Sequence, residues 1–324
     1  MNSKDQKVLV SSFVKEVNEG LTAFPKYLSS KFFYDEVGDE LFQQIMALPE
    51  YYLTRAEYEI FKTHKANIIH HFDAKNEGFD LIELGAGDGK KTKLLLEELL
   101  QKEHNFTYNP IDISENAIEG LVKDLNLEMP NVAVQGQIGE YFEVLDRLKQ
   151  MSDRKKVIMV LGSNIGNLLH PRAIQFLKKL CNAMHNDDLL FMGFDQKKHP
   201  QKVLDAYNDK SGVTAAFNKN ILARINKELD ANFNLDKFIH WETYDPESGT
   251  AKSYLISKEK QTVDINGLSL QIYFEAWESI HTEISQKYDD DIVKWLAKES
   301  GLKIEKSFSD KNKDYKNYLI SKVK

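Results

Sequence analysis

Cysteine is almost absent from this chain, since Cys181 is the only one among 324 residues. A single cysteine excludes an internal disulfide and a cysteine-rich zinc site, and it fits a reducing cytoplasm. Cys181 lies in a run with helical spacing, so we expect it to be buried packing rather than a nucleophile. No apolar run approaches the roughly 18 residues of a membrane span, and no long apolar segment follows residues 1–7. We therefore expect no membrane span, no signal peptide and a cytoplasmic location.

Positive charge is not concentrated in any segment. The 43 lysines and arginines are outnumbered by 50 acidic residues, which gives a formal net charge of −7. Nucleic-acid binding is disfavoured, because contacts to phosphates need a basic stripe. The 9 histidines show no metal-ligand spacing, so we expect no metal. The hydrophobic content of 42% and the chain length suit an ordinary globular protein of two packed subdomains.

A glycine-rich loop follows a short apolar run that ends at Glu83. The glycines stand at alternate positions, Gly85, Gly87 and Gly89, and the residues after them have a helical pattern. A strand, a tight turn and a helix N-terminus form a cradle for a nucleotide-like group. Lys90 stands where the dinucleotide fingerprint needs its third glycine. The loop instead resembles the first motif of S-adenosylmethionine (SAM) dependent methyltransferases, and another nucleotide or a structural turn stay open as alternatives at this point.

A second acidic residue, Asp112, ends the next apolar segment, which begins at Asn105. In a parallel βαβ unit the end of this strand lies beside the glycine turn. A carboxylate there can accept hydrogen bonds from both hydroxyls of a ribose. Ser114 has the position of an N-cap for the following helix. The alternative is that Asp112 is only a turn residue.

The order of the expected elements indicates an α/β fold. Short apolar strands alternate with helical segments, which predicts a doubly wound parallel sheet. After residue 301, two alternating segments flank a polar turn at 310–314, which predicts a closing β-hairpin. The expected strands are 79–84, 106–112, 131–135, 156–162 and 188–195, and the expected helices include 91–102, 115–124 and 171–184.

The remaining residues predict a second, α+β subdomain inserted after the fifth strand. Residues 200–230 have the pattern of one or two helices, and strands are expected at 237–244, 251–258, 261–265 and 268–274, with Asn266-Gly267 as a type I′ turn. We expect a SAM-binding domain at 61–193 and 287–324, and a substrate-recognition subdomain at 1–60 and 194–286. An insertion at this point of the chain is a natural source of substrate specificity.

A series of motifs then matches one family in order. They are Phe33-Tyr34-Asp35, Leu48-Pro-Glu-Tyr-Tyr52-Leu-Thr-Arg55-Ala-Glu57, Glu83-Leu-Gly-Ala-Gly-Asp-Gly-Lys-Lys-Thr92, Leu161-Gly-Ser-Asn-Ile-Gly-Asn167, Ser211-Gly-Val-Thr-Ala-Ala-Phe-Asn218 and Thr282-Glu-Ile-Ser285. From about residue 20 onward the chain resembles the histidine-specific SAM-dependent methyltransferases that make hercynine, the first intermediate of ergothioneine biosynthesis.

The resemblance implies a fold and a reaction. The fold would be the Rossmann-like sheet of class I SAM methyltransferases, parallel with a C-terminal antiparallel hairpin, plus an inserted α+β substrate subdomain. The chain would transfer methyl groups from SAM to the α-amine of free L-histidine three times, leaving S-adenosylhomocysteine. We expect a small-molecule amino-acid substrate, no nucleic-acid or membrane partner, and a monomer.

The resemblance also implies which residues hold SAM. Lys91 would meet the methionine carboxylate, although by itself it could be a solvated helix lysine. Glu140 would meet the adenine amine and Tyr141 would pack on the ring, where the family more often has Asp-Phe. The full set of expected cofactor residues is Tyr34, Gly85, Gly87, Lys91, Asp112, Glu140 and Tyr141.

On the substrate side, Asn167 and Tyr207 would hold the α-carboxylate, and the Gly162 loop would border the amine. These three are the expected catalytic residues. Glu283 and Ser285 would take the two imidazole nitrogens, and their spacing in an extended segment places both side chains on one face. Taken alone, the tyrosines could be core residues, Asn167 a helix cap and Glu283 a solvated acid. The expected substrate-binding residues are Tyr51, Asn164, Asn167, Tyr207, Ser253, Glu283 and Ser285.

Two residues depart from the family pattern. Ser253 stands where we expect an apolar, Met-like pocket wall, and Asn164 replaces a Thr of the amine-side loop. Both leave room for altered side-chain specificity. The alternatives are therefore an Nα-methyltransferase of another aromatic amino acid, a methyltransferase of protein or RNA, which the acidic balance disfavours, and a non-catalytic protein that binds SAM or an amino acid.

Overall fold

The structure is a computed structural model that describes residues 3–73, 77–87 and 89–323, and the side chains from Ser12 onward. The chain divides into two compact units. Unit 1 comprises residues 1–52 and 198–286, and unit 2 comprises residues 53–197 and 287–324. The sequence predicts boundaries between residues 60 and 61 and between residues 193 and 194. In the structure the two units meet along the chain between residues 52 and 53 and between residues 197 and 198. The difference arises because α3 (Leu53–Phe72) belongs entirely to unit 2 and Gln196 forms a β-bridge with Tyr288 in the same unit.

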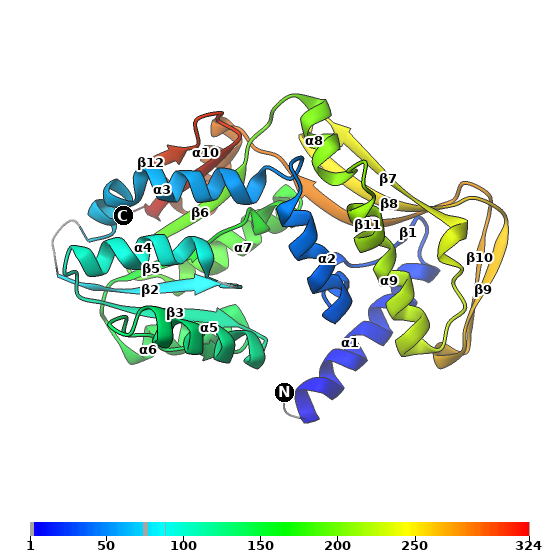
Figure 1. Cartoon of the computed structure of the whole chain (residues 1–324), viewed down its shortest axis with the longest axis horizontal. Coiled ribbons are helices and arrows are strands. Elements are labelled where there is room, and N and C mark those ends of the chain that lie inside the picture. The colour runs from blue at the N-terminus through cyan, green and yellow to red at the C-terminus, as the bar shows by residue number, and fades with distance from the viewer. Residues whose placement is uncertain (1–2, 74–76, 88, 324) are drawn as a thin grey trace. The chain divides into compact units, whose positions relative to one another are not determined.

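Unit 2 is built on a seven-stranded sheet with the order β12-β13-β6-β5-β2-β3-β4 (Figure 1). The pairs from β6 to β4 are parallel, and the C-terminal hairpin β12–β13 joins antiparallel to β6. The strands are β2 (Phe79–Leu84), β3 (Phe106–Asp112), β4 (Gln137–Ile138), β5 (Lys156–Val160), β6 (Leu189–Asp195), β12 (Leu302–Ser309) and β13 (Tyr315–Lys322). This confirms the expected α/β fold and the closing hairpin.

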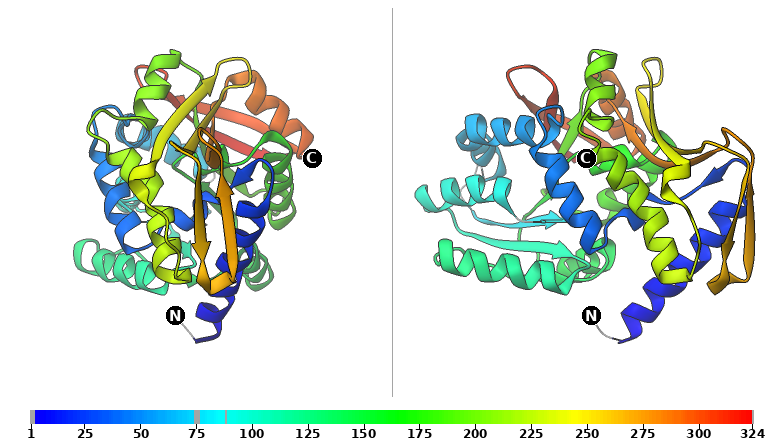
Figure 2. Two further views of the ribbon diagram at one scale, coloured as in Figure 1. Left: turned by 90° about the vertical axis from the view of Figure 1, so that its right-hand side faces the viewer. Right: turned by 45° about the vertical axis from the view of Figure 1, so that its right-hand side comes forward.

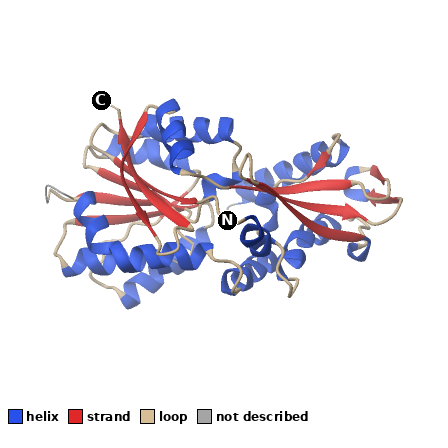
Figure 3. Cartoon of the chain, turned by 90° about the horizontal axis from the view of Figure 1, so that it is seen from above, coloured by secondary structure: helices blue, strands red, loops and turns tan. Residues whose placement is uncertain are grey.

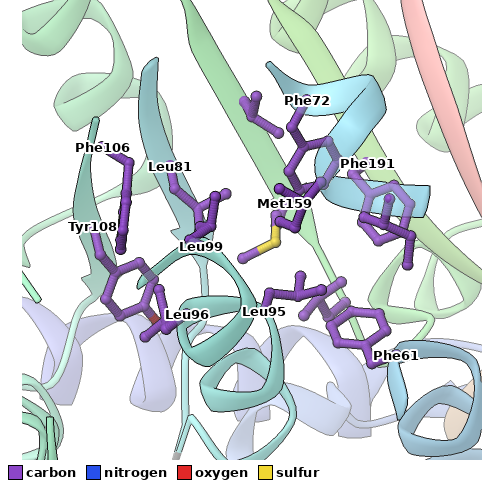
Figure 4. Close-up of a cluster of buried hydrophobic side chains, with 14 of the residues drawn as sticks. Phe61, Phe72, Leu81, Leu95, Leu96, Leu99, Phe106, Tyr108, Met159 and Phe191 are labelled. Atoms are coloured by element: carbon purple, nitrogen blue, oxygen red, sulfur yellow. The ribbon is translucent and has the colours of Figure 1, made fainter. Parts of the chain in front are cut away.

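Helices cover both faces of this sheet (Figure 3). Leu95, Leu96 and Leu99 of α4 pack with the α3 side chains on a core that includes Leu81, Met159 and Phe191 of three strands (Figure 4). A second core cluster contains side chains of α6, α7 and α10. The remaining helices of the unit are α4 (Lys90–Gln101), α5 (Glu115–Glu128), α6 (Tyr141–Met151), α7 (His170–Ala183), α10 (Asp290–Glu299) and the 3₁₀ helix η2 (Asn164–Asn167).

Unit 1 is an α+β structure with a four-stranded sheet of order β1-β11-β8-β7. The helices α8 and α9 pack against β7 and β8 (Figure 2). The strands are β1 (Lys26–Tyr27), β7 (Phe238–Asp245), β8 (Thr250–Ser257) and β11 (Ser279–Gln286), with a separate hairpin of β9 (Gln261–Ile265) and β10 (Leu270–Phe274). The helices are α1 (Ser3–Thr22), α2 (Glu36–Ala47), α8 (Pro200–Tyr207) and α9 (Val213–Leu229), with 3₁₀ turns η1 (Ser30–Phe33), η3 (Leu235–Lys237) and η4 (Asn266–Leu268).

Two local predictions were wrong. Residues 131–135 form no strand, and they pair with β3 only through an isolated β-bridge between Tyr108 and Val134. The fourth strand along the chain is residues 137–138. The Asn266-Gly267 pair does not form a type I′ turn, because it opens a 3₁₀ turn and the left-handed residue of the loop is Ser269. By contrast, Ser114 caps α5 as expected, with its hydroxyl accepting from the Ala117 N–H at 3.3 Å.

Candidate active site

The glycine loop of unit 2 joins β2 to α4 and turns through left-handed backbone conformations. Gly85, Gly87 and Gly89 all have positive φ angles, of 72°, 55° and 65°. A Cβ atom at Gly85 would lie 2.8 Å from the Tyr141 hydroxyl, whereas one at Gly87 would meet nothing within 4 Å. The loop therefore needs glycine at Gly85 for both conformation and space. It leads into the N-terminus of α4, where backbone N–H groups favour an anionic ligand.

The ends of the neighbouring strands bring the expected ribose and adenine residues to this loop. Asp112 ends β3, and its carboxylate accepts from the Ser114 N–H at 2.9 Å. Burial raises the pKa of the Tyr141 hydroxyl to about 12, and the negative charges of Asp112 and Glu140 add to the rise. The structure thus brings Gly85, Asp112, Glu140 and Tyr141 together at the carboxyl edge of the parallel strands, where such sheets bind ligands.

Glu83, just before the loop, points into the core. Its side chain accepts from the Tyr108 hydroxyl at 2.6 Å and the Thr92 hydroxyl at 2.7 Å. Burial raises the pKa of Glu83 to about 7. Glu83 therefore ties β2, β3 and α4 together beneath the loop.

Lys91 is not a solvated lysine. Its ammonium lies 2.5 Å from Oε2 of Glu57, a residue of α3 with 0% exposure. The same carboxylate accepts from the Gly162 N–H at 2.9 Å, and its other oxygen accepts from Asn317 at 2.8 Å and the Tyr315 hydroxyl at 3.1 Å. Glu57 thus links Lys91 with the loop after β5. It had no expected role, although its place beside buried Ala56, Ile60 and Phe61 on the helix was a signal of burial.

The loop after β5 carries three further expected residues. Gly162 has a φ of 72°, and the Asn164 amide would lie 3.7 Å from a Cβ at Gly162 and 4.0 Å from one at Gly85. Asn167 ends η2 and is exposed. The Asn164 side chain therefore borders both glycine positions in unit 2.

Unit 1 holds the other expected residues. The Tyr207 hydroxyl, at the end of α8, lies 2.7 Å from the Ser285 hydroxyl on β11. The Tyr51 ring packs edge-on to Tyr207 at 6.3 Å between centroids. Glu283 and Ser285 lie in one strand, opposite Ser253 and Ala251 of β8. Their alternate positions place them on one face of the sheet, as the spacing predicts.

Tyr34 lies in unit 1, although we expected it with the cofactor residues. Its ring packs against Phe42 and Phe217, and its side chain retains 44% exposure. Partial burial raises the pKa of the Tyr34 hydroxyl, and the nearby carboxylate of Glu283 raises it further. The position of Tyr34 is therefore near Glu283, and its role in SAM binding stays a prediction.

The carbonyl of Tyr207 is held by His240 of β7. Nε2 of His240 lies 2.8 Å from this oxygen, and Nδ1 lies 2.7 Å from the Asn218 amide nitrogen. An amide nitrogen can only donate, so Nδ1 accepts and Nε2–H donates to Tyr207. Burial lowers the pKa of His240, which suits this neutral form. Sequence reasoning missed His240, and its period-two spacing from the buried Phe238 was the available signal.

The sheet order, the glycine loop and the acidic residue that ends β3 are the features expected of a class I SAM-dependent methyltransferase. The family model described as "Histidine-specific methyltransferase, SAM-dependent" matches residues 13–322, and the chain belongs to this family.

Three named proteins illustrate what this chain is similar to. The histidine N-alpha-methyltransferase of Mycolicibacterium smegmatis is 36% identical over 89% of this chain and 88% of its own. The protein of the same name from Mycobacterium tuberculosis is 34% identical over 95% of this chain and 94% of its own. Ergothioneine biosynthesis protein 1 of Schizosaccharomyces pombe is 29% identical over 91% of this chain, which spans 39% of that longer protein.

Two classes of feature are absent from the described part of the chain. Its helices include none with the length and apolar character needed to cross a bilayer. Among the same residues, His, Cys, Asp and Glu side chains form no group of three or more that could hold a metal ion.

Proposed function

We propose that this chain transfers methyl groups from SAM to the α-amine of free L-histidine, three times in succession, to give Nα,Nα,Nα-trimethylhistidine (hercynine). The observation that carries the proposal is the group of Tyr207, Ser285 and Glu283 on one face of the unit 1 sheet. A carboxylate and a hydroxyl suit the two nitrogens of an imidazole ring. Membership of the histidine-specific family and the names of the relatives support the same substrate.

SAM supplies an activated methyl group on a sulfonium, and the residues of unit 2 would hold it. Asp112 would accept from the ribose hydroxyls, Glu140 and Tyr141 would meet the adenine, and Lys91 with the α4 N-terminus would meet the carboxylate. These contacts agree with the grouping of Gly85, Asp112 and Tyr141 at one edge of the sheet.

Each transfer forms an N–C bond, breaks a C–S bond and consumes the lone pair of a neutral amine. The amine of a free amino acid is mostly protonated at neutral pH, so a proton must leave before each transfer. In unit 1, Tyr207 would hold the substrate carboxylate. The roles expected of Asn167 and the Gly162 loop in unit 2 stay predictions. We propose that positioning is the main source of rate. The proposal includes a monomer that acts in the cytoplasm without a metal.

The test is mass spectrometry on the purified protein given SAM and an equimolar mixture of the common amino acids. We expect methylated histidine ending as the trimethyl betaine. Another methylated amino acid would replace histidine as the substrate and favour the aromatic alternative. Binding of SAM with no methylated amino acid would overturn the proposal in favour of a binding protein or a macromolecular substrate.

A substitution of Glu283 tests whether this residue binds the imidazole ring. We expect Glu283→Ala to bind S-adenosylhomocysteine normally and to lose histidine affinity by about ten- to a hundredfold, because a hydrogen bond to a carboxylate contributes about 1.5–3 kcal/mol. Glu40→Ala, an exposed site on α2, is the matched control. Unchanged histidine affinity in Glu283→Ala, measured by calorimetry, would remove Glu283 from the site.

A further inference from the structure

Three polar residues form a row across the unit 1 sheet. Ser253 of β8 is paired with Glu283 of β11 on one side and with Glu242 of β7 on the other. Directly opposite residues of neighbouring strands project to the same face, with Cβ atoms about 5 Å apart. The row therefore continues the expected imidazole site by two strands, from Glu283 through Ser253 to Glu242.

The bond within this row gives Ser253 a defined role. Its hydroxyl donates to Oε2 of Glu242 at 2.6 Å, a short distance typical of a bond to a charged acceptor. Both residues are buried, with 4% exposure for Ser253 and 7% for Glu242. A serine hydroxyl has one proton and two lone pairs, so a hydroxyl that donates to Glu242 presents only acceptor capacity elsewhere.

The row lies on the same face as the residues expected to bind the amino acid. Along β7, His240 and Glu242 are two residues apart and share a face. His240 holds the carbonyl of Tyr207 at 2.8 Å, and the hydroxyl of Tyr207 meets Ser285 of β11. Glu242 and Ser253 are thus part of the surface that carries Tyr207, Ser285 and Glu283.

We propose that Glu242 is a specificity-determining residue of the amino-acid site. Because Glu242 accepts the hydrogen bond of the Ser253 hydroxyl, that hydroxyl can only accept from a ligand, so the site favours side chains with N–H donors over hydrocarbon rings. This inference rests on the proposed function and names a residue that favours a ring with an N–H group, such as the imidazole of histidine. It also gives a role to Ser253, which stands where the family pattern has an apolar residue in the pocket wall.

A purely structural role for Glu242 makes a different prediction. If the carboxylate only joins β7 to β8, its loss lowers stability but leaves the relative affinities for amino acids unchanged. A role in specificity changes affinity for histidine and leaves affinity for a hydrocarbon ring unaffected. The Glu242→Gln variant separates the two, because its amide can donate as well as accept and so no longer keeps Ser253 an acceptor.

The experiment measures calorimetric affinities of the full chain for histidine and phenylalanine in the presence of S-adenosylhomocysteine. The proteins are the wild type, Glu242→Gln, Ser253→Ala, the double variant, and Glu40→Gln as an exposed control. We expect each single variant to weaken histidine binding about five- to tenfold. Affinities for phenylalanine and S-adenosylhomocysteine should not fall. We expect the double variant to be no weaker than Ser253→Ala, because both changes act on one hydroxyl.

Equal histidine affinity in the wild type and both single variants would overturn the inference, as would losses that add fully in the double variant. Should Glu242→Gln fail to fold, Ser253→Ala carries the same test through its histidine-to-phenylalanine ratio. A wild-type protein that does not bind histidine at all would contradict the proposed function itself, so the two failures are distinct.

Discussion

The ammonium of Lys91 lies 2.5 Å from Oε2 of the buried Glu57, and the same oxygen accepts the Gly162 N–H. One carboxylate of α3 thereby holds the first turn of α4 and the loop after β5. Lys91 is expected to meet the methionine carboxylate of SAM, and the Gly162 loop is expected to border the substrate amine. Glu57 is a positioning residue for both.

Glu57→Ala removes the acceptor of four hydrogen bonds at once. Removing one partner of a buried ion pair costs about 3–5 kcal/mol, so we expect the free energy of unfolding to fall by roughly that amount. Glu57→Gln should fold better and raise KM for SAM, because Lys91 loses its charged partner. Urea unfolding and initial rates measure the two effects. Glu59→Gln, on the same helix, is the control, and a Glu57→Gln variant with wild-type stability and KM would contradict this role.

Glu83 should make stability fall as pH rises from its ordinary pKa of 4.5 to its folded value of about 7. Within this window the unfolded chain has released the proton that the folded state still binds, so folding becomes less favourable with rising pH. The shift corresponds to about 3 kcal/mol. In Glu83→Gln, whose carbonyl can still accept from Tyr108 and Thr92, this part of the pH dependence should vanish. Urea unfolding at about pH 5 and about pH 8 measures it, and the same pH slope in both proteins would contradict the assignment.

Gly85→Ala should weaken S-adenosylhomocysteine binding at least about tenfold and destabilise the protein by about 1–3 kcal/mol, because the new methyl group meets the Tyr141 hydroxyl in a strained backbone. Adding Tyr141→Phe removes the clashing oxygen and should restore part of the binding. Gly212→Ala, also at positive φ but in open space in unit 1, is the control for strain alone. Calorimetry and thermal unfolding report both effects, and the absence of any recovery in the double variant would refute the steric explanation.

Tyr207→Phe removes the hydroxyl that meets Ser285. We expect affinity for histidine to fall about ten- to a hundredfold, because a hydrogen bond from this hydroxyl to the substrate carboxylate would contribute about 1.5–3 kcal/mol, while KM for SAM stays unchanged. Tyr27→Phe, at an exposed tyrosine of the same unit, is the control. Steady-state kinetics with each substrate varied in turn gives the answer, and an equal change in both KM values would indicate general damage to unit 1 instead.

The amino-acid sequence by itself determined those features that depend on neighbours along the chain. The alternating glycines at 85–89, the Ser114 cap, four of the five apolar strands expected for the parallel sheet and the polar turn of the C-terminal hairpin are local patterns that the structure has. The shared face of Glu283 and Ser285 follows from strand periodicity alone. The order of family motifs named the family, which the match over residues 13–322 shows.

Only the tertiary structure decided which distant residues meet. The four hydrogen bonds to Glu57 come from α4, the Gly162 loop and β13, and sequence spacing contains no information about that convergence. The Ser253–Glu242 pair depends on the register of β7 and β8, which hydrophobic alternation specifies only as inward or outward. The fourth strand at 137–138 and the left-handed Ser269 were likewise set by packing and loop closure. Local periodicity fixes which face a side chain occupies, whereas its partner on that face is chosen by long-range packing.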